Sequence, residues 1–147
     1  RGALVAVRQL APRSCNAAIE AISVRLFDAD ATVQAGAADA VCLLAERGHP
    51  RVTRLLCKRA STSEAAVRSV VVKALGLVAL VGDARARAAL HKAMGDPSAA
   101  VRREAVLAIS RITPKGQEET MRELVTMLGD ADETVRHAAV QGIRDTA

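Results

Sequence analysis

The sequence predicts an all-α protein built as an α-solenoid of about four stacked antiparallel helical hairpins. Three observations predict this fold: a 34-residue internal repeat, an apolar pattern with helical periodicity inside each repeat, and an apolar composition dominated by Ala and Val. Half of the 147 residues are hydrophobic, yet Phe27 is the only aromatic residue. Small aliphatic side chains suit the thin layer between closely packed helices, so the composition favours a stack over one large core.

The repeat is clearest in a column of valines that recurs every 34 residues. Its members are Val33, Val67, Val101 and Val135. Positions four, seven and eight residues after each valine hold small or aliphatic side chains in every unit. These offsets lie on one face of an α-helix and do not follow the alternation of a strand. Each unit therefore begins with a helix that starts shortly before its valine.

Capping residues mark the starts of these first helices. One column holds Asp28, Thr62, Asp96 and Asp130, and a second column, two residues later, holds Asp30, Glu64, Ser98 and Asp132. Either column fits the N-terminus of a helix, because both contain residues that cap amide groups or favour the helix dipole. A third column holds Gly48, Gly82 and Gly116. Glycine is common just after a helix, so this column is expected to close the first helices.

A second helix follows in each unit, and one of its columns is always apolar. This column holds Ile22, Leu56, Leu90 and Leu124. The predicted units are residues 1–27, 28–61, 62–95, 96–129 and 130–147, of which the first and last are incomplete. In the first unit, Leu4, Val7 and Leu10 occupy columns of a first helix. We interpret residues 1–147 as a single repeat domain and expect it to be part of a longer array, because such hairpins are stable only when stacked.

The segments at residues 96–102 and 130–136, with their Asp at the start and Val-Arg at the end, resemble HEAT repeats. They resemble in particular the short form seen in phycobilisome-lyase-type HEAT proteins, and the resemblance covers nearly the whole chain. Tetratricopeptide repeats share the period but use aromatic residues, which are missing here. The resemblance implies a right-handed superhelix.

The resemblance also implies a polar ladder along the stack, formed by the Asp and by the Arg six positions later. Asp96 with Arg102, and Asp130 with Arg136, match this pattern fully. Arg68 keeps the basic member, although Thr62 replaces its acid. At the preceding position, Gln34 replaces the base. The regular recurrence of the arginines favours a stack-building role over ligand binding.

Positive charge is concentrated in the middle of the chain. Residues 47–115 carry a net charge of +10, whereas residues 1–46 carry −1 and residues 116–147 carry −4. Six of the cations fall on the expected second helices: Arg51, Arg54, Lys58, Arg85, Arg87 and Lys92. Second helices usually line the concave surface of HEAT-like stacks, so we expect these six residues to form a basic stripe there. The alternative is a solvated surface that keeps the stack soluble.

The stripe suggests a function in binding. We interpret the chain as a non-catalytic protein–protein interaction scaffold whose basic surface docks an acidic protein partner. Electrostatic binding of a nucleic-acid backbone is the alternative, although single-strand binders use aromatic platforms that this chain lacks. A lyase or enzyme-associated role is implied only by the resemblance, because fold does not define function.

No catalytic, cofactor or metal site is predicted. None of His49, His91 and His137 lies in a metal-binding or catalytic motif, and the chain has no glycine-rich phosphate loop. Cys57, beside two basic residues, is the one candidate for a reactive thiol, with His91 in the same repeat column. The alternative interpretation of Cys57 is a small apolar filler.

The three cysteines, Cys15, Cys42 and Cys57, form no disulfide or metal-binding pattern. No apolar run is long enough to cross a membrane. We therefore expect an intracellular, cytoplasmic protein that does not bind membranes.

Overall fold

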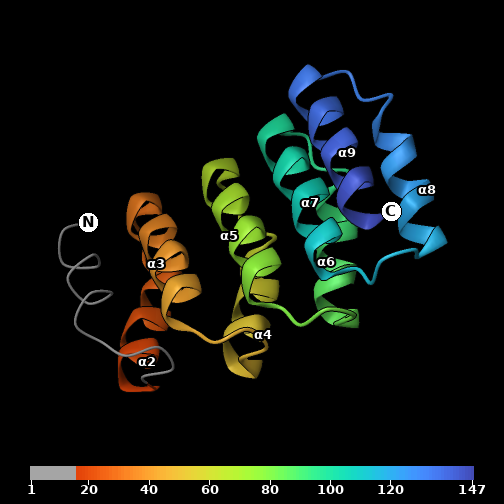
Figure 1. Ribbon diagram of the computed structural model, residues 1–147. Coiled ribbons are helices and arrows are strands. Elements are labelled where there is room, and N and C mark those ends of the chain that lie inside the picture. The colour runs from red at the N-terminus through yellow and green to blue at the C-terminus, as the bar shows by residue number, and fades with distance from the viewer. Residues whose placement is uncertain (1–15) are drawn as a thin grey trace.

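The structure is a computed structural model that describes residues 16–147, which form eight α-helices arranged in two layers (Figure 1). The first helices of the units are α3 (Ala31–Leu44), α5 (Ala65–Val78), α7 (Ala99–Ile112) and α9 (Glu133–Thr146). The second helices are α2 (Asn16–Val24), α4 (Pro50–Arg59), α6 (Ala84–Ala93) and α8 (Glu118–Met127). A 3-10 turn, η1, spans Arg25–Phe27. The prediction of an all-α stack of hairpins is confirmed, whereas the expected helix around Leu4, Val7 and Leu10, together with Cys15, lies outside the described residues.

The starts of the first helices use both candidate capping columns. The caps are Asp30, Glu64, Ser98 and Asp132, so the second column holds the true N-cap position. The aspartates of the first column bind that cap instead: the Asp96 carboxylate accepts a hydrogen bond from the Ser98 amide at 2.8 Å. Asp130 accepts one from the Asp132 amide at 2.9 Å. At α3 and α9, both columns supply a side-chain acceptor for backbone amides, whereas Glu64 and Ser98 make no side-chain cap hydrogen bond.

The glycine column has a different role from the one expected. The first helices end at Leu44, Val78 and Ile112, several residues before Gly48, Gly82 and Gly116. These glycines directly precede the caps of the second helices and have φ angles of +89°, +84° and +79°. Glycine fits this left-handed conformation without steric cost.

Each of these glycines also links its unit to the next one. The Gly82 amide donates a hydrogen bond to the Ile112 carbonyl at 2.7 Å, and the Gly116 amide donates one to the Thr146 carbonyl at 2.8 Å. Gly48 donates to Val78 in the same way. A glycine of one unit therefore caps the last turn of the first helix in the following unit, where carbonyl groups lack intrahelical partners.

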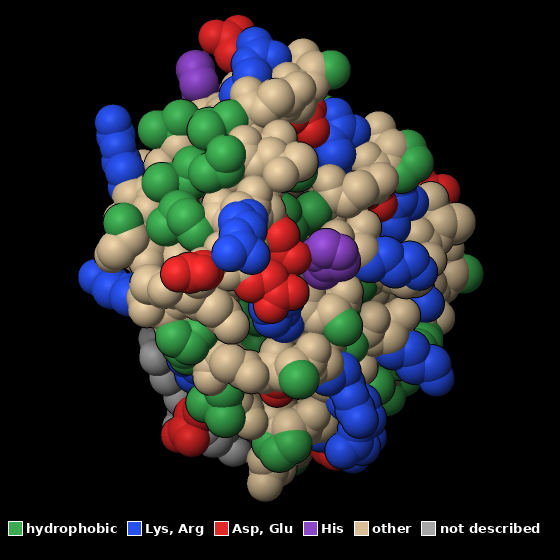
Figure 2. Space-filling view, turned by 90° about the vertical axis from the view of Figure 1, so that its right-hand side faces the viewer, with side chains coloured by type: hydrophobic (Ala, Val, Ile, Leu, Met, Phe, Trp, Pro, Cys, Tyr) green, Lys and Arg blue, Asp and Glu red, His purple; other side chains and the backbone are tan. Residues whose placement is uncertain are grey.

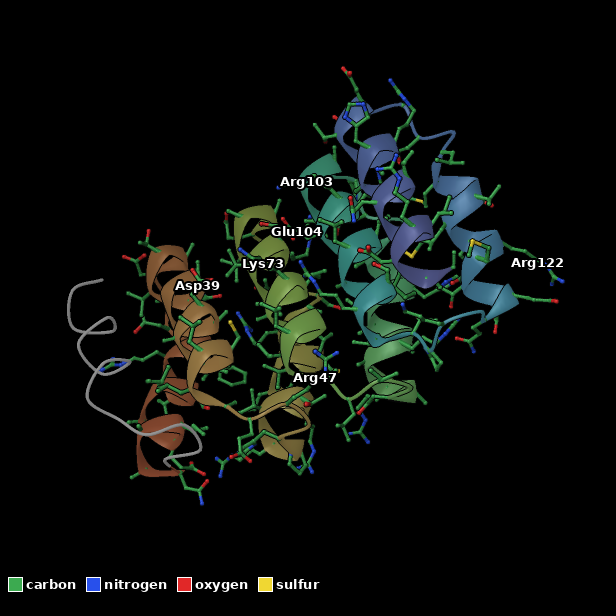
Figure 3. All side chains as sticks on the ribbon, in the orientation of Figure 1. Asp39, Arg47, Lys73, Arg103, Glu104 and Arg122 are labelled. Atoms are coloured by element: carbon green, nitrogen blue, oxygen red, sulfur yellow. The ribbon has the colours of Figure 1, made fainter. Side chains whose placement is uncertain are left out.

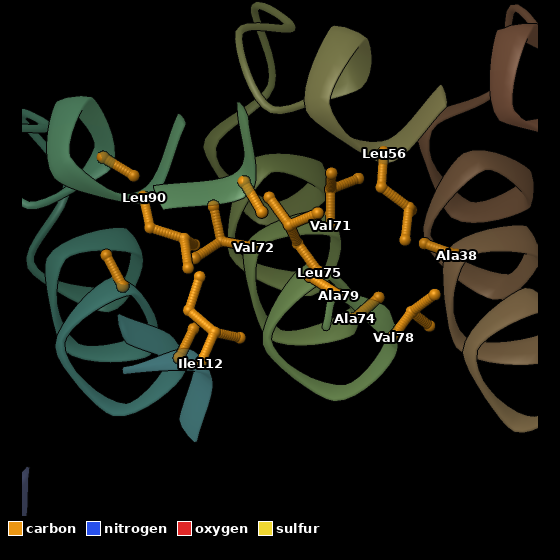
Figure 4. Packing of buried hydrophobic residues seen from close by; sticks show 14 of the residues in the cluster. Ala38, Leu56, Val71, Val72, Ala74, Leu75, Val78, Ala79, Leu90 and Ile112 are labelled. Atoms are coloured by element: carbon orange, nitrogen blue, oxygen red, sulfur yellow. The ribbon is translucent and has the colours of Figure 1, made fainter. Parts of the chain in front are cut away.

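The core lies between the two layers and runs the length of the stack. One large aliphatic residue from each second helix is almost fully buried, in the order Ile22, Leu56, Leu90 and Leu124. These side chains pack against the small columns of the first helices, as Figure 4 shows around Leu56, Val72, Leu75 and Leu90. The first helices approach closely at Gly76, where an added Cβ atom would lie 2.5 Å from the Ala108 Cβ atom. The small residues therefore set the spacing between units.

The first helices pack more closely on one another than the second helices do. Helix α3 packs on α5, α5 on α7 and α7 on α9 over long stretches, whereas contacts between successive second helices are far sparser. Figure 1 shows the second helices spread more widely along the stack. The first helices are therefore closer to one another along the stack than the second helices are. The expectation that the second helices line the concave surface stays a prediction.

Within residues 16–147, every helix is too short or too polar to cross a lipid bilayer.

Candidate protein-binding surface

The polar ladder joins successive units, and its pairing differs from the one expected. The Arg68 guanidinium donates to the Asp96 carboxylate through Nε at 2.8 Å and Nη2 at 2.9 Å. Arg102 donates to Asp130 through the same two atoms at 2.9 and 3.0 Å. Each arginine therefore binds the aspartate that begins the next unit, 28 residues further along the chain. Bidentate geometry of this kind makes strong, directional pairs.

Each ladder arginine also binds the residue six positions earlier, through the backbone carbonyl of that residue. Nη1 of Arg102 donates to the Asp96 carbonyl at 2.9 Å, and Nη1 of Arg136 donates to the Asp130 carbonyl at 2.8 Å. Arg68 makes the equivalent contact with the carbonyl of Thr62 at 3.1 Å. The loss of an acid at Thr62 therefore leaves this contact intact, because a backbone carbonyl is present at every residue.

Gln34 and Thr62 replace the charged ladder residues at one junction between units. Arg59 makes the connection there. Nη2 of Arg59 donates to the Gln34 side chain at 2.6 Å and to the Thr62 hydroxyl at 3.1 Å. Arg59 comes from the end of α4, so it reaches the junction from the second layer. Sequence reasoning counted Arg59 only as part of the basic block. The repeat column gives only a partial signal: Arg25 holds the same position in the first unit and pairs with Asp28 at 3.5 Å, whereas Ala93 and Met127 hold it in the later units.

The ladder carboxylates have lowered pKa values. Hydrogen bonding from Arg102 lowers the pKa of Asp130 below its ordinary value. Burial raises the pKa of Asp96, but the hydrogen bonds from Arg68 and from the Ser98 amide outweigh it and leave that pKa lowered. A carboxylate with a lowered pKa in the folded state contributes stability that is present above its unfolded pKa and disappears as pH falls through the folded value.

We therefore expect the stability contributed by the ladder to be constant above about pH 5 and to fall as pH drops below about 4. The variant carrying Asp96→Asn and Asp130→Asn should be less stable at neutral pH, and its acid-induced loss should be smaller. Urea unfolding measured across this pH range checks the prediction. An equal loss in both proteins between pH 5 and pH 2 would count against it.

Two residues of the basic stripe are occupied in ion pairs between units. Arg51 pairs with Glu20 of α2. Arg87 lies 3.3 Å from a carboxylate oxygen of Glu123 and also reaches Glu119 at 3.6 Å, and its side chain is largely buried. Both arginines therefore connect neighbouring second helices. Their acidic partners satisfy them, so they are poor candidates for binding a partner.

The other four stripe residues remain exposed: Arg54, Lys58, Arg85 and Lys92. We call this set the α4–α6 basic surface. Arg54 and Lys58 are one helical turn apart on α4, and Arg85 and Lys92 are two turns apart on α6, so each pair follows one face of its helix. No ion pair involves any of the four within residues 16–147. Seen from the α8–α9 end of the stack, Lys and Arg side chains gather on the right-hand side of Figure 2.

Two open hollows lie at opposite ends of this surface. The one near the N-termini of α4 and α6 has a volume of about 340 Å³, and its lining includes Arg54, Arg85 and Leu80. The one near their C-termini has a volume of about 470 Å³, and its lining includes Lys92 and Ser61. The sparse contact between α4 and α6 leaves this room, so cations and hollows occur together on the second-helix layer.

A second group of cations lies on the first-helix layer. Figure 3 shows Lys73 and Arg103 on α5 and α7, with Asp39 and Glu104 nearby. Arg103 pairs with Glu104 at 3.0 Å. The sequence analysis counted Lys73 and Arg103 in the net charge of residues 47–115 but did not propose them as a site. Acidic neighbours make this surface mixed in charge, unlike the α4–α6 basic surface.

The candidate reactive groups take part in packing, ion pairing and helix capping. Burial raises the pKa of the Cys57 thiol, which opposes formation of a reactive thiolate. Nδ1 of His91 lies 2.9 Å from Glu123, and His49 caps α4 by accepting a hydrogen bond from the Val52 amide. Residues 16–147 hold no cluster of three His, Cys, Asp or Glu side chains arranged to bind a metal ion.

Stacked helical hairpins joined by a polar ladder, with a charged and hollowed second-helix layer, define an α-helical repeat protein of the solenoid class. The family model described as HEAT repeats matches residues 56–144, which is more than half of the chain. The chain belongs to the HEAT-repeat family. Proteins of this family generally act as scaffolds for protein–protein interaction and are typically non-catalytic. No curated protein is significantly similar to the chain in sequence.

Proposed function

We propose that this protein is a non-catalytic scaffold that binds an acidic protein segment on the α4–α6 basic surface. The observation that carries the proposal is the coincidence of four exposed cations without acidic partners and two hollows between the same helices. An extended acidic segment that lies along α4 and α6 would place carboxylates near cations at both ends. Complementary charge of this kind speeds association and selects the partner.

The alternative partner is a nucleic-acid backbone, which is also negatively charged. Single-strand binding uses exposed aromatic rings, and Phe27 is the one aromatic residue of the chain. The Phe27 ring already lies beneath cations, with Lys58 at 5.8 Å and Arg59 at 5.1 Å from its centroid. These contacts favour an acidic protein over single-stranded nucleic acid. A protein can bind a nucleic-acid duplex without ring stacking. A binding test must therefore include a duplex as a probe.

Reversing the charge of the α4–α6 basic surface is expected to abolish partner binding without unfolding the protein. The variant carries Arg54→Glu, Arg85→Glu and Lys92→Glu, all at exposed helical positions where Glu is a comparable helix former. Affinity capture from native extract with the wild-type protein and the variant checks this. An acidic protein should be retained by the wild type and lost from the variant.

The matched control reverses three exposed cations of the first-helix layer: Lys73→Glu, Arg103→Glu and Arg111→Glu. This control changes the net charge by the same amount on a different surface. Retention of the same partner by the control, with loss from the α4–α6 variant, supports a local site. Equal loss from both variants would mean that net charge alone, and no particular surface, determines binding.

A further inference from the structure

The turn between α5 and α6 exposes two large aliphatic side chains. Leu80 and Val81 are each 53% exposed. The turns that join first to second helices lie along one edge of the stack (Figure 1). The same two repeat positions hold other residue types in the neighbouring turns: Glu46 and Arg47, then Pro114 and Lys115. Exposed aliphatic side chains rimmed by polar residues are typical of interaction sites, so the α5–α6 turn is a candidate for one.

Leu80 forms one wall of the hollow at the N-termini of α4 and α6. Pro50, the first residue of α4, also lines this hollow, whose volume is about 340 Å³. A Cβ atom added at Gly48 would lie 2.7 Å from the Leu80 Cγ atom. The absence of a side chain at Gly48 therefore leaves room for Leu80 to pack across the preceding turn. Ligand pockets range from about 300 to 1,000 Å³, so this hollow suits a single side chain.

The polar groups of this hollow are either satisfied within the protein or cationic. The Asp83 carboxylate caps α6 by accepting a hydrogen bond from a backbone amide at 2.9 Å. The Thr53 hydroxyl donates to the His49 carbonyl at 2.9 Å. Arg54 and Arg85 are exposed, and neither forms an ion pair in the part of the chain that the structure describes. The hollow therefore offers an aliphatic wall and two available cations.

The hollow at the C-termini of α4 and α6 has a more polar lining. Three successive residues, Ser61, Thr62 and Ser63, contribute hydroxyl groups to it. The Lys92 Nζ atom lies 3.4 Å from the Ser61 Oγ atom. The aliphatic part of this lining consists of alanines and Pro97. A carboxylate therefore suits the C-terminal hollow, whereas an aliphatic side chain suits the hollow beside Leu80.

We propose that the acidic segment on the α4–α6 basic surface carries an aliphatic side chain, of about the size of leucine, that occupies the hollow beside Leu80. Carboxylates on either side of this side chain bind Arg54 and Arg85, which select an acidic segment over other apolar peptides. Burial of the aliphatic side chain against Leu80 and Pro50 adds affinity that charge alone does not supply. This inference rests on the proposed function, because it names the kind of segment that the same surface binds.

Two fluorescent peptides test the inference: a polyglutamate peptide, and the same peptide with leucine in place of its central glutamate. The wild-type protein should bind the leucine peptide about tenfold more tightly, although this peptide carries one negative charge fewer. Both affinities should fall as salt rises, whereas their ratio should persist, because salt screens charge and not apolar contact. Binding of polyglutamate without any gain from leucine overturns the inference and leaves the proposed function standing. Absence of binding by both peptides overturns both.

A pair of variants locates the gain. Leu80→Ser removes the aliphatic wall and should bring the affinities for the two peptides within about twofold of each other. The matched control is Val125→Ser on α8, a side chain that is 52% exposed and lies outside the α4–α6 basic surface. It should keep the full preference for the leucine peptide, and circular dichroism checks the folding of both variants. Persistence of the preference in Leu80→Ser, or its loss in Val125→Ser, overturns the inference. If Leu80→Ser does not fold, the comparison of the two peptides on the wild type decides.

Discussion

Replacing Arg102 with Ala is expected to lower the free energy of unfolding by about 3 kcal/mol. The Arg102 and Asp130 side chains are 18% and 10% exposed, so the substitution leaves a largely buried carboxylate without its counter-ion. It also removes hydrogen bonds to the carbonyls of Asp96 and Pro97. Urea unfolding followed by circular dichroism measures the loss. Arg102→Lys should recover only a part of it, because an ammonium group cannot form the bidentate contact.

The matched control for this prediction is Arg103→Ala at the neighbouring position of the same helix. The Arg103 side chain is 45% exposed, although that of its partner Glu104 is only 13% exposed. Solvent screens the exposed guanidinium, and Arg103 makes a single contact with Glu104 instead of a bidentate one, so this substitution should have a smaller effect than Arg102→Ala. Similar losses for the two variants would show that the ladder pair is not special.

Replacing Gly76 with Ala is expected to destabilise the stack by about 2 kcal/mol. Alanine is the better helix former, so propensity alone predicts a gain of about 1 kcal/mol. The added Cβ atom would lie 2.5 Å from the Ala108 Cβ atom and 2.7 Å from its Cα atom. Relief of this overlap requires α5 and α7 to move apart, because a backbone atom is involved. Steric overlap therefore outweighs helix propensity at this position.

Gly95→Ala provides the comparison for Gly76→Ala. The nearest atom to a Cβ added at Gly95 is the Lys92 carbonyl oxygen at 3.6 Å, which is an ordinary contact. We expect this variant to be as stable as the wild type or slightly more stable. Thermal unfolding of the two variants under the same conditions gives the comparison. If Gly76→Ala proves as stable as Gly95→Ala, close packing of α5 on α7 does not limit the stack.

The fold was predictable because each unit repeats the same local information. The valine column, the paired caps and the apolar column of the second helices all lie within one 34-residue unit. Local sequence therefore determines where each helix starts and which face it buries. The cap position needed the structure, because both acidic columns satisfy the same local rule and only geometry separates Asp96 from Ser98.

Features that join separate units were harder to predict. The ladder aspartate bound by Arg102 lies 28 residues away, whereas the sequence pattern drew attention to the aspartate six residues before it. The pairing of Arg87 with Glu123 depends on the distance between two second helices, which no local pattern contains. The spacing between units depends on how closely the first helices pack, and that follows from side-chain volumes such as those of Gly76 and Ala108.

The most direct test of the binding account is a titration of the protein with a fluorescent polyglutamate peptide, followed by anisotropy at low and moderate salt. The account predicts binding to the wild type that weakens as salt rises, no binding to the Arg54→Glu, Arg85→Glu and Lys92→Glu variant, and binding to the control reversed on the first-helix layer. A short DNA duplex serves as the competing probe. Equal affinity of the wild type and the α4–α6 variant for the peptide, or tighter binding of the duplex than of the peptide, would contradict the account.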